Sequence, residues 1–350
     1  MGIPRFFYWL YKEHPYVMTK IQERDTLLKH KINIDTYALD LNAIVHPICQ
    51  QVFGYGQYKD GQTNGGIKRL MHSKKEVNSY PSKRIECYNK ICEKIDELVN
   101  IVNPRTKLIL ALDGTAGMSK QYQQRQRRYR AVIENPMIIK KDFDSNEITT
   151  GSVFMNELSQ CINEYISFKV KNEWKELDIY FSSEQVPGEG EHKIIDYIKQ
   201  HSESEEHNDI IYALDGDLIF LASSIPKPNI YLFREAGIYS KLIDNLTHID
   251  RYSPFLYMHI TELKSCVIKD FQDNYGCNIN AELHQENQKY INDWIFLGML
   301  LGNDFIPKCH WFSIDNNGYE RLISAYWQIH NHTELFLVDT NKMTINTEML

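Results

Sequence analysis

The chain has 350 residues and a mass of 41.3 kDa, with 43% hydrophobic and 24% charged residues. This balance is typical of a globular protein, and it excludes a wholly disordered chain, a collagen and a coiled-coil rod. The formal net charge of −7 gives no general sign of nucleic-acid binding. The longest apolar run, residues 294–301, is too short to span a bilayer.

The start of the chain carries no secretory signal pattern, and Phe6 stands where N-myristoylation after Gly2 requires Ser or Thr. The seven cysteines form no CxxC pair, which is typical of reduced thiols and not of disulfides or a zinc site. We therefore expect an intracellular protein, cytoplasmic or nuclear, that is not secreted and has no membrane partner.

Residues 6–11 are almost wholly aromatic or apolar and predict the start of a buried helix. Residues 53–90 are rich in Gly, Lys and Asn, and they hold eight basic residues against three acids. We predict a mobile basic loop over about 53–82, followed by a helix over about 82–102. Short apolar runs bounded by turn residues predict buried parallel strands. These runs are residues 37–41, 106–114, 178–181 and 210–215.

The other predicted elements are mainly helices and polar linkers. The linkers are residues 142–150 and 201–208, and the helices are residues 151–171, 194–199, 255–271, 291–301 and 319–330. The predicted fold class is α/β, with a mainly parallel sheet flanked by helices and a helical C-terminal part. We place the α/β core at residues 1–250 and the helical part at 251–350.

Three of the predicted strands end in an aspartate: Asp40, Asp113, and Asp215, which Asp217 follows. The carboxyl ends of parallel strands meet in one crevice, where ligands bind. A single aspartate there is commonly a turn residue or a helix N-cap. Three such acids together favour a bound cation, and carboxylate oxygens are the ligands that Mg²⁺ prefers.

Further acids lie in two Gly- and Pro-containing segments. Glu189 and Glu191 are separated by one glycine within residues 186–193. They either face one ion from a turn or serve as acids in the first turn of a helix, where the helix dipole favours them. Asp304 lies at the end of an apolar helix, where a carboxylate is unfavourable unless a cation offsets it.

Residues 119–130 carry five basic residues and no acid. The segment is either a solvated helix face or a phosphate pocket, and a solvated face normally mixes both signs of charge. Its position just after Asp113 is the layout expected for phosphodiester cleavage near a bound phosphate. The helical spacing places four of its side chains on one face. They are Lys120, Gln124, Arg127 and Arg128.

Other nucleotide-binding and hydrolase patterns are absent from the sequence. No GxGxxG follows a predicted strand, no P-loop Gly-Lys-Ser/Thr occurs, and no GxSxG nucleophile elbow is present. These observations exclude the usual dinucleotide, P-loop and α/β-hydrolase readings.

Six motifs in order resemble the 5′-to-3′ exoribonuclease family, whose members degrade 5′-monophosphorylated RNA. The resemblance extends from residue 1 to about residue 335. The motifs are residues 1–10 (MGIPRFFYWL), 39–47 (LDLNAIVHP), 113–130, 186–193 (VPGEGEHK), 215–218 (DGDL) and 301–307 (LGNDFIP).

The resemblance implies a PIN/flap-endonuclease-like core with two Mg²⁺ ions, for which Mn²⁺ can substitute. It implies a 5′-phosphate pocket at Lys120, Gln124, Arg127 and Arg128. It also implies that His46 stacks on a terminal base, although a single His beside a Pro is commonly structural. The implied metal-binding and catalytic acids are Asp40, Asp113, Glu189, Glu191, Asp215, Asp217 and Asp304.

The chain departs from the family in three respects. Gly117 and Met118 stand where the family has Pro-Arg, in a stretch that helps to exclude duplex, and Gly216 replaces the usual alanine. The family's second conserved region is absent from this sequence, so a second chain carrying that region is a candidate partner.

We therefore expect a Mg²⁺-dependent 5′-to-3′ exoribonuclease that hydrolyses 5′-monophosphorylated single-stranded RNA to nucleoside 5′-monophosphates. Two alternatives remain at this point. One is a structure-specific DNA flap nuclease on the same core, and the other is an RNA-binding member of the family that does not cut.

Overall fold

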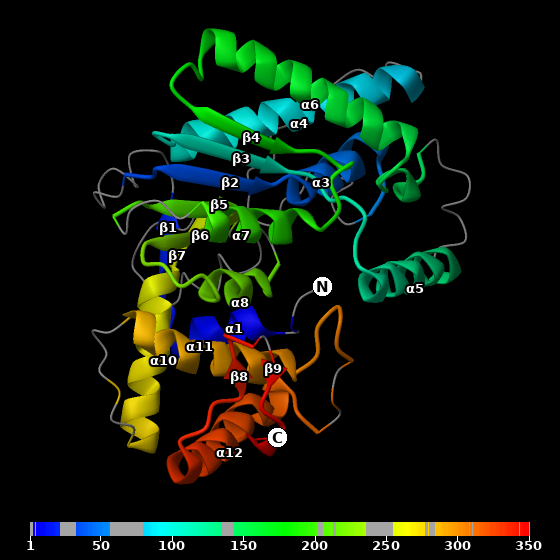
Figure 1. Ribbon diagram of the computed structural model, residues 1–350. Coiled ribbons are helices and arrows are strands. Elements are labelled where there is room, and N and C mark those ends of the chain that lie inside the picture. Colours follow the sequence, from blue (N-terminus) through cyan, green and yellow to red (C-terminus); the bar gives the residue numbers. More distant parts are fainter. Residues whose placement is uncertain are drawn as a thin grey trace.

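The computed structural model of the chain is shown in Figure 1. Among the residues that the structure describes, the core is one seven-stranded sheet with the strand order β1-β7-β6-β5-β2-β3-β4. The part of the chain that the structure describes comprises residue 3 and residues 5–21, 33–56, 80–134, 143–201, 206–212, 215–235, 255–276, 279, 284–307, 309, 311–342 and 344–349. The predicted basic loop lies mostly outside these residues, as do parts of both predicted linkers.

Five neighbouring strands of the sheet run parallel, which confirms the predicted fold class. They include all four predicted strands. Strand β2 is buried along almost its whole length because helices cover both faces of the sheet. The parallel strands are β2 (Thr36–Asp40), β3 (Lys107–Ala111), β4 (Asp178–Ser182), β5 (Asp209–Tyr212) and β6 (Ile230–Glu235).

The prediction of one helix over residues 255–271 is wrong in its first part. Phe255–His259 forms strand β7, which pairs antiparallel with β6 and with β1 (Met18–Ile21). Four consecutive buried apolar residues are compatible with a strand covered on both faces, and pairing on both sides decides in favour of the strand. Helix α10 (Ile260–Tyr275) follows directly, with the His259 side chain accepting a hydrogen bond from the Glu262 amide.

Alternate side chains of the strands enter two separate hydrophobic clusters, one on each face of the sheet. Tyr37 and Leu39 of β2 belong to one cluster, and Ala38 belongs to the other. This alternation follows from the two-residue period of a strand. On the first face lie α3 (Asn42–Phe53), α4 (Tyr80–Val102) and α6 (Val153–Asn172).

The second face is covered by helices from both ends of the chain, which Figure 1 shows below the sheet. Phe6 is fully buried there and its ring lies 4.3 Å from that of Phe220. One hydrophobic cluster thus contains residues from both sides of position 250. The division into an α/β core and a helical part at that position stays a prediction. The helices are α1 (Phe6–Glu13), α7 (Gly190–Gln200), α8 (Leu218–Ser223), α10, α11 (His284–Met299) and α12 (Gly318–Thr333).

Three smaller features complete the described chain. Helix α5 (Met118–Glu134), the predicted basic helix, stands at the side of the molecule where β3 ends (Figure 1). Strands β8 (Val338–Asp339) and β9 (Thr344–Ile345) form a separate antiparallel pair. Short 3-10 turns occur at Pro15–Val17, Ser145–Glu147, Ile314–Asn316 and Thr347–Met349. No helix within the described ranges is long and apolar enough to cross a membrane.

Candidate active site

The predicted acids meet where three neighbouring parallel strands end. Asp40 is the last residue of β2, Asp113 follows β3 by two residues, and Asp215 follows β5 by three. Strands β3 and β5 flank β2 on its two sides. The carboxyl ends of the strands therefore bring these aspartates to one edge of the sheet, as the sequence predicted.

Helix α7 begins closer to these aspartates than the sequence indicated. It starts at Gly190 and not at residue 194, so Glu191 lies in its first turn and Glu189 immediately precedes it. The Gly190 amide donates a 2.7 Å hydrogen bond to Asp113 Oδ1. A Cβ atom on Gly190 would lie 2.7 Å from Asp40 Oδ1. A residue without a side chain is therefore required where the helix meets the two aspartates.

Asn42 joins the same two aspartates from the other side. Its backbone amide donates to Asp40 Oδ1 at 3.1 Å, and its side-chain oxygen accepts from the Asp113 amide at 3.2 Å. The roles of Asn42 and Gly190 were not predicted from the sequence. The available signals were the position of Asn42 two residues after a strand-end acid and a glycine enclosed by two glutamates.

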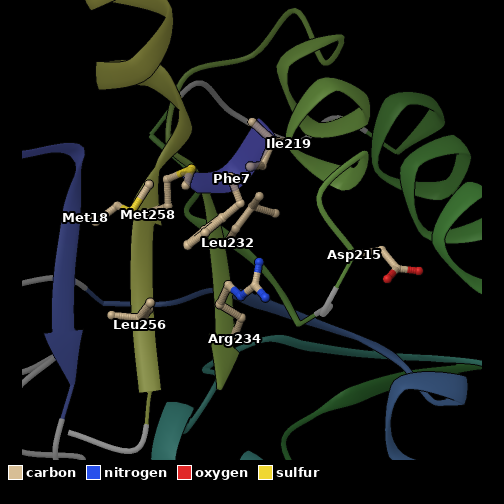
Figure 2. A pocket seen from close by; sticks show the side chains of 8 residues that line it. All are labelled: Phe7, Met18, Asp215, Ile219, Leu232, Arg234, Leu256 and Met258. Atoms are coloured by element: carbon tan, nitrogen blue, oxygen red, sulfur yellow. The ribbon is translucent and has the colours of Figure 1, made fainter. Parts of the chain in front are cut away.

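Among the described residues, two sets of side chains offer potential ligand atoms, and the atoms within each set lie within 4.8 Å of one another. One set is Glu191, Asp215 and Asp217, and the other is Glu189, Glu191 and His192. Glu191 belongs to both sets. Figure 2 shows Asp215 beside a small, mainly apolar pocket, with its carboxylate pointing away from the other lining side chains. His192 was not among the site residues predicted from the sequence, although it adjoins Glu191 in the most specific motif.

The close carboxylates disfavour full ionisation. Burial, and next the charge of Asp217, raises the pKa of Glu191 to about 9. Burial and the charge of Asp113 raise the pKa of Asp40 well above its ordinary value. Burial and Asp215 likewise raise the pKa of Asp217. Burial also raises the pKa of Asp113, although the hydrogen bond from Gly190 opposes that shift. Such a site retains protons at neutral pH unless another cation replaces them.

The residues present fit a hard divalent cation. Their donors are carboxylate oxygens, which suit Mg²⁺ and Mn²⁺. The side chain of Asp217 is largely buried, and its Oδ1 atom accepts no hydrogen bond from the part of the chain that the structure describes. A buried oxygen without a donor is costly, and a cation next to Glu191 and Asp215 would satisfy it.

Asp304 joins this group through a cation that belongs to the chain. Lys120 Nζ lies 2.7 Å from Asp304 Oδ2 and 2.6 Å from Glu189 Oε2. Gln123 also donates to Asp304 Oδ1 at 3.2 Å. Burial raises the pKa of Asp304, but the hydrogen bond and charge of Lys120 hold it below its ordinary value. The cation that the position of Asp304 called for is thus, in this structure, a lysine.

The remaining residues of the basic face lie along α5. Gln124 is partly buried, while Arg127 and Arg128 are exposed, and Arg128 donates to Thr149 Oγ1 at 2.9 Å. Burial, and next the charge of Arg127, lowers the pKa of His46 to about 4. His46 of α3 and Arg127 of α5 are therefore electrostatic neighbours, and the imidazole is neutral at physiological pH.

A family model described as "XRN 5'-3' exonuclease N-terminus" matches residues 1–236, which is more than half of the chain. The chain belongs to the XRN 5′-3′ exonuclease family. A second model, described as "Xrn1 helical domain", matches residues 284–349. The resemblance that the six motifs carried is thereby confirmed.

The XRN chain is also similar to curated proteins from several organisms. It is 28% identical over 370 residues to "5'-3' exoribonuclease 1" of Saccharomyces cerevisiae, covering 99% of this chain and 22% of that protein. It is 26% identical to "5'-3' exoribonuclease 2" of Kluyveromyces lactis and to that of Gallus gallus, covering 38% and 40% of those proteins and 99% and 97% of this chain. The chain thus spans between about a fifth and two-fifths of the length of these XRN relatives.

The comparison with solved structures gives a match to "The catalytic core of Rad2 in complex with DNA substrate (complex III)". The XRN chain is 13% identical to it, with a TM-score of 0.43, and the match covers 97% of this chain and 75% of that one.

Proposed function

We propose that the chain is a Mg²⁺-dependent 5′-to-3′ exoribonuclease that hydrolyses 5′-monophosphorylated single-stranded RNA to nucleoside 5′-monophosphates. The observation that carries this proposal is the convergence of the carboxylates at one sheet edge beside a cationic helix. Membership of the XRN 5′-3′ exonuclease family supports the proposal that this arrangement is a nuclease site. The intracellular location expected from the sequence agrees with RNA as the substrate.

The metal ligands in this proposal are the carboxylates of the strand ends and of α7. Glu191, Asp215 and Asp217 would hold one ion, and the neighbouring Asp40, Asp113 and Glu189 would hold a second, with Asp304 at the margin. When bound, Mg²⁺ activates a water for in-line attack and stabilises the charge on the leaving oxygen.

The chain's own residues fix the position of the RNA end. Arg127 and Arg128 are exposed on α5 and present forked donors that suit a terminal phosphate. Gln124 lies on the same helix face and adds an amide donor. His46, kept neutral by burial and by the charge of Arg127, is suited to stack on the terminal base.

A partner for long RNA substrates is part of the proposal. The curated relatives extend far beyond the matched region. A polypeptide that carries the family's second conserved region would wall the site and support processive degradation through base stacking and backbone contacts. Where the present sequence is not joined to that region, the region would be supplied by a second chain.

The test compares 5′-phosphorylated RNA, single-stranded DNA of the same sequence and a DNA flap, each incubated with the purified chain in Mg²⁺ or in EDTA. We expect mononucleotides from RNA in Mg²⁺ and none in EDTA. Asp217→Asn should reduce the rate by more than the roughly 10–100-fold typical of residues that only support metal ligands. Cleavage of the DNA flap while the RNA stays uncut would indicate the flap nuclease. Binding of RNA without cleavage would indicate the non-cutting alternative.

A further inference from the structure

Lys120 has two carboxylate partners in this structure. Its ammonium nitrogen lies 2.6 Å from Glu189 and 2.7 Å from Asp304. The lysine side chain is 12% exposed and the two carboxylates are 9% and 6% exposed. The Phe305 ring lies 5.4 Å from the same nitrogen. The ammonium group is therefore held inside the acidic group and does not extend along the exposed face of α5.

This position conflicts with a fixed role for Lys120 in the phosphate pocket. Glu189 belongs to the set of potential metal ligands that also contains Glu191 and His192. An ammonium at hydrogen-bond distance from Glu189 and Asp304 uses oxygens that a divalent cation would also need. Two of the three N–H donors of the ammonium are then taken, so it can donate at most one hydrogen bond to a terminal phosphate.

We propose that Lys120 is an exchangeable counter-ion that couples metal loading to recognition of the 5′ end. In the metal-free protein it neutralises Glu189 and Asp304. When those carboxylates take a divalent cation, Lys120 is released toward the terminal phosphate on the Arg127 side of α5. This inference rests on the proposed function and adds to it an order of events and a thermodynamic link.

The physical basis is competition followed by reciprocity. A lysine ammonium is a compact charge on a flexible stem, so it can change partners without moving the helix that carries it. If metal binding frees Lys120 for the phosphate, then phosphate binding must strengthen metal binding by the same factor. Gln123 lies three residues further along α5 and holds Asp304 through Oδ1. The carboxylate would therefore stay in place when the lysine leaves.

The first experiment measures Mg²⁺ binding by titration calorimetry without RNA. Lys120→Met removes the competing ammonium and should tighten Mg²⁺ binding within the roughly 5–150-fold range typical of coupled sites. Lys120→Gln is a second variant for the case that Lys120→Met folds poorly. Lys120→Arg keeps the positive charge, so its Mg²⁺ affinity should stay close to that of the wild type. Arg127→Met removes the same charge from the same helix face. Unlike Lys120, Arg127 has no carboxylate ion pair within the described ranges. The Mg²⁺ affinity of Arg127→Met should therefore differ from that of the wild type by less than about threefold, as for screened charges.

The second experiment measures coupling with ligands that contain no cleavable phosphodiester. A nucleoside 3′,5′-bisphosphate is compared with the matching 3′-monophosphate, which lacks only the 5′-phosphate. In the wild type, Mg²⁺ should increase the preference for the 5′-phosphate by several-fold. In Lys120→Met this increase should disappear, although Mg²⁺ binds more tightly.

The two experiments distinguish a failure of the proposed Lys120 exchange from a failure of the proposed nuclease function. If Lys120→Met and Arg127→Met change Mg²⁺ affinity equally, or if coupling persists in Lys120→Met, the exchange is wrong while the nuclease proposal stands. If the wild type shows no Mg²⁺ binding that depends on Glu191 and Asp217, the proposed function fails and the exchange fails with it.

Discussion

Glu191 is the clearest example of a single residue in this site that destabilises the metal-free folded protein. It is 8% exposed, and burial together with Asp217 raises its pKa to about 9. The unfolded chain releases this proton near the ordinary pKa of a glutamate, while the folded chain retains it until higher pH. Between those two values the folded state binds more protons, so its stability falls as pH rises.

We therefore expect Glu191→Gln to stabilise the metal-free protein at pH 8. The gain should be roughly 1–3 kcal/mol at pH 8 and smaller at pH 5, because near the ordinary pKa of a glutamate the unfolded chain also binds this proton and folding then requires little proton uptake. Urea unfolding in EDTA at both pH values measures this. Glu176→Gln, at an exposed position, is the matched control. A loss of stability at pH 8 would contradict the raised pKa.

The same carboxyls predict how metal binding depends on pH. Ligands must be deprotonated, so Mg²⁺ must displace protons held by Glu191, Asp217 and Asp40. The apparent affinity should rise with pH between about 6 and 9, by about tenfold per pH unit for each proton displaced. Calorimetry in two buffers of different ionisation enthalpy counts these protons. A flat affinity over this range would show that the metal-free site is already ionised.

At the scale of the element, the start of α7 depends on one glycine. A Cβ at Gly190 would meet Asp40 Oδ1 at 2.7 Å and the Ala111 carbonyl oxygen at 3.1 Å. Gly190→Ala should destabilise the protein by roughly 1–3 kcal/mol, as overpacking does, and should weaken Mg²⁺ binding because Asp40 must move.

A nearby glycine supplies the control for this prediction. Gly216 lies between Asp215 and Asp217, and a Cβ there meets nothing within 4 Å. Gly216→Ala should leave Mg²⁺ affinity unchanged and stability within about 1 kcal/mol of wild type. Thermal unfolding and calorimetry of both variants test the pair, and equal effects would show that glycine identity, not space, matters.

Helix α5 should act as a sensor of the RNA end. A hydrogen bond to a charged group contributes roughly 1.5–3 kcal/mol, or about 10–150-fold in rate. Arg127→Ala or Arg128→Ala should slow decay of 5′-phosphorylated RNA within that range and barely affect 5′-hydroxyl RNA. Gln126→Ala is the control, because Gln126 is exposed and lies two residues from both Gln124 and Arg128, which turns it away from their face of α5. Equal slowing on both substrates would indicate a general backbone contact.

The helices and strands also show which features could be predicted from the sequence and which could not. The strand-end acids could be predicted because burial, a turn and a carboxylate occur within a few consecutive residues. The contact of Lys120 with Asp304 could not, because 184 residues separate the two. Strand β7 was mistaken for helix because its buried apolar run has no period, and only pairing with β1 and β6 identifies it.

At the scale of the whole molecule, one hydrophobic cluster joins the two ends of the chain. Phe6 packs between Phe220, Trp294 and Tyr319. Phe6→Ala should destabilise the protein by roughly 3–5 kcal/mol, the usual cost of emptying a buried aromatic site. Tyr8→Ala on the exposed side of α1 should cost about 1 kcal/mol or less. Urea unfolding followed by tryptophan fluorescence and circular dichroism measures both.

The result for Phe6→Ala also tests whether the helical part is separate from the sheet. If both spectroscopic signals shift together, the molecule unfolds as one unit across position 250. If only the fluorescence shifts, the division predicted from the sequence describes two units that unfold independently.

The position of α1 also has a consequence for synthesis on the ribosome. Trp9 donates a hydrogen bond to Glu320, a residue 311 positions later. At translation rates of about 5–20 residues per second, α1 is made roughly 15–60 s before that partner exists. During this interval the apolar side of α1, which the folded protein buries, has no core to enter. The nascent N-terminus is therefore the segment on which a chaperone should act first.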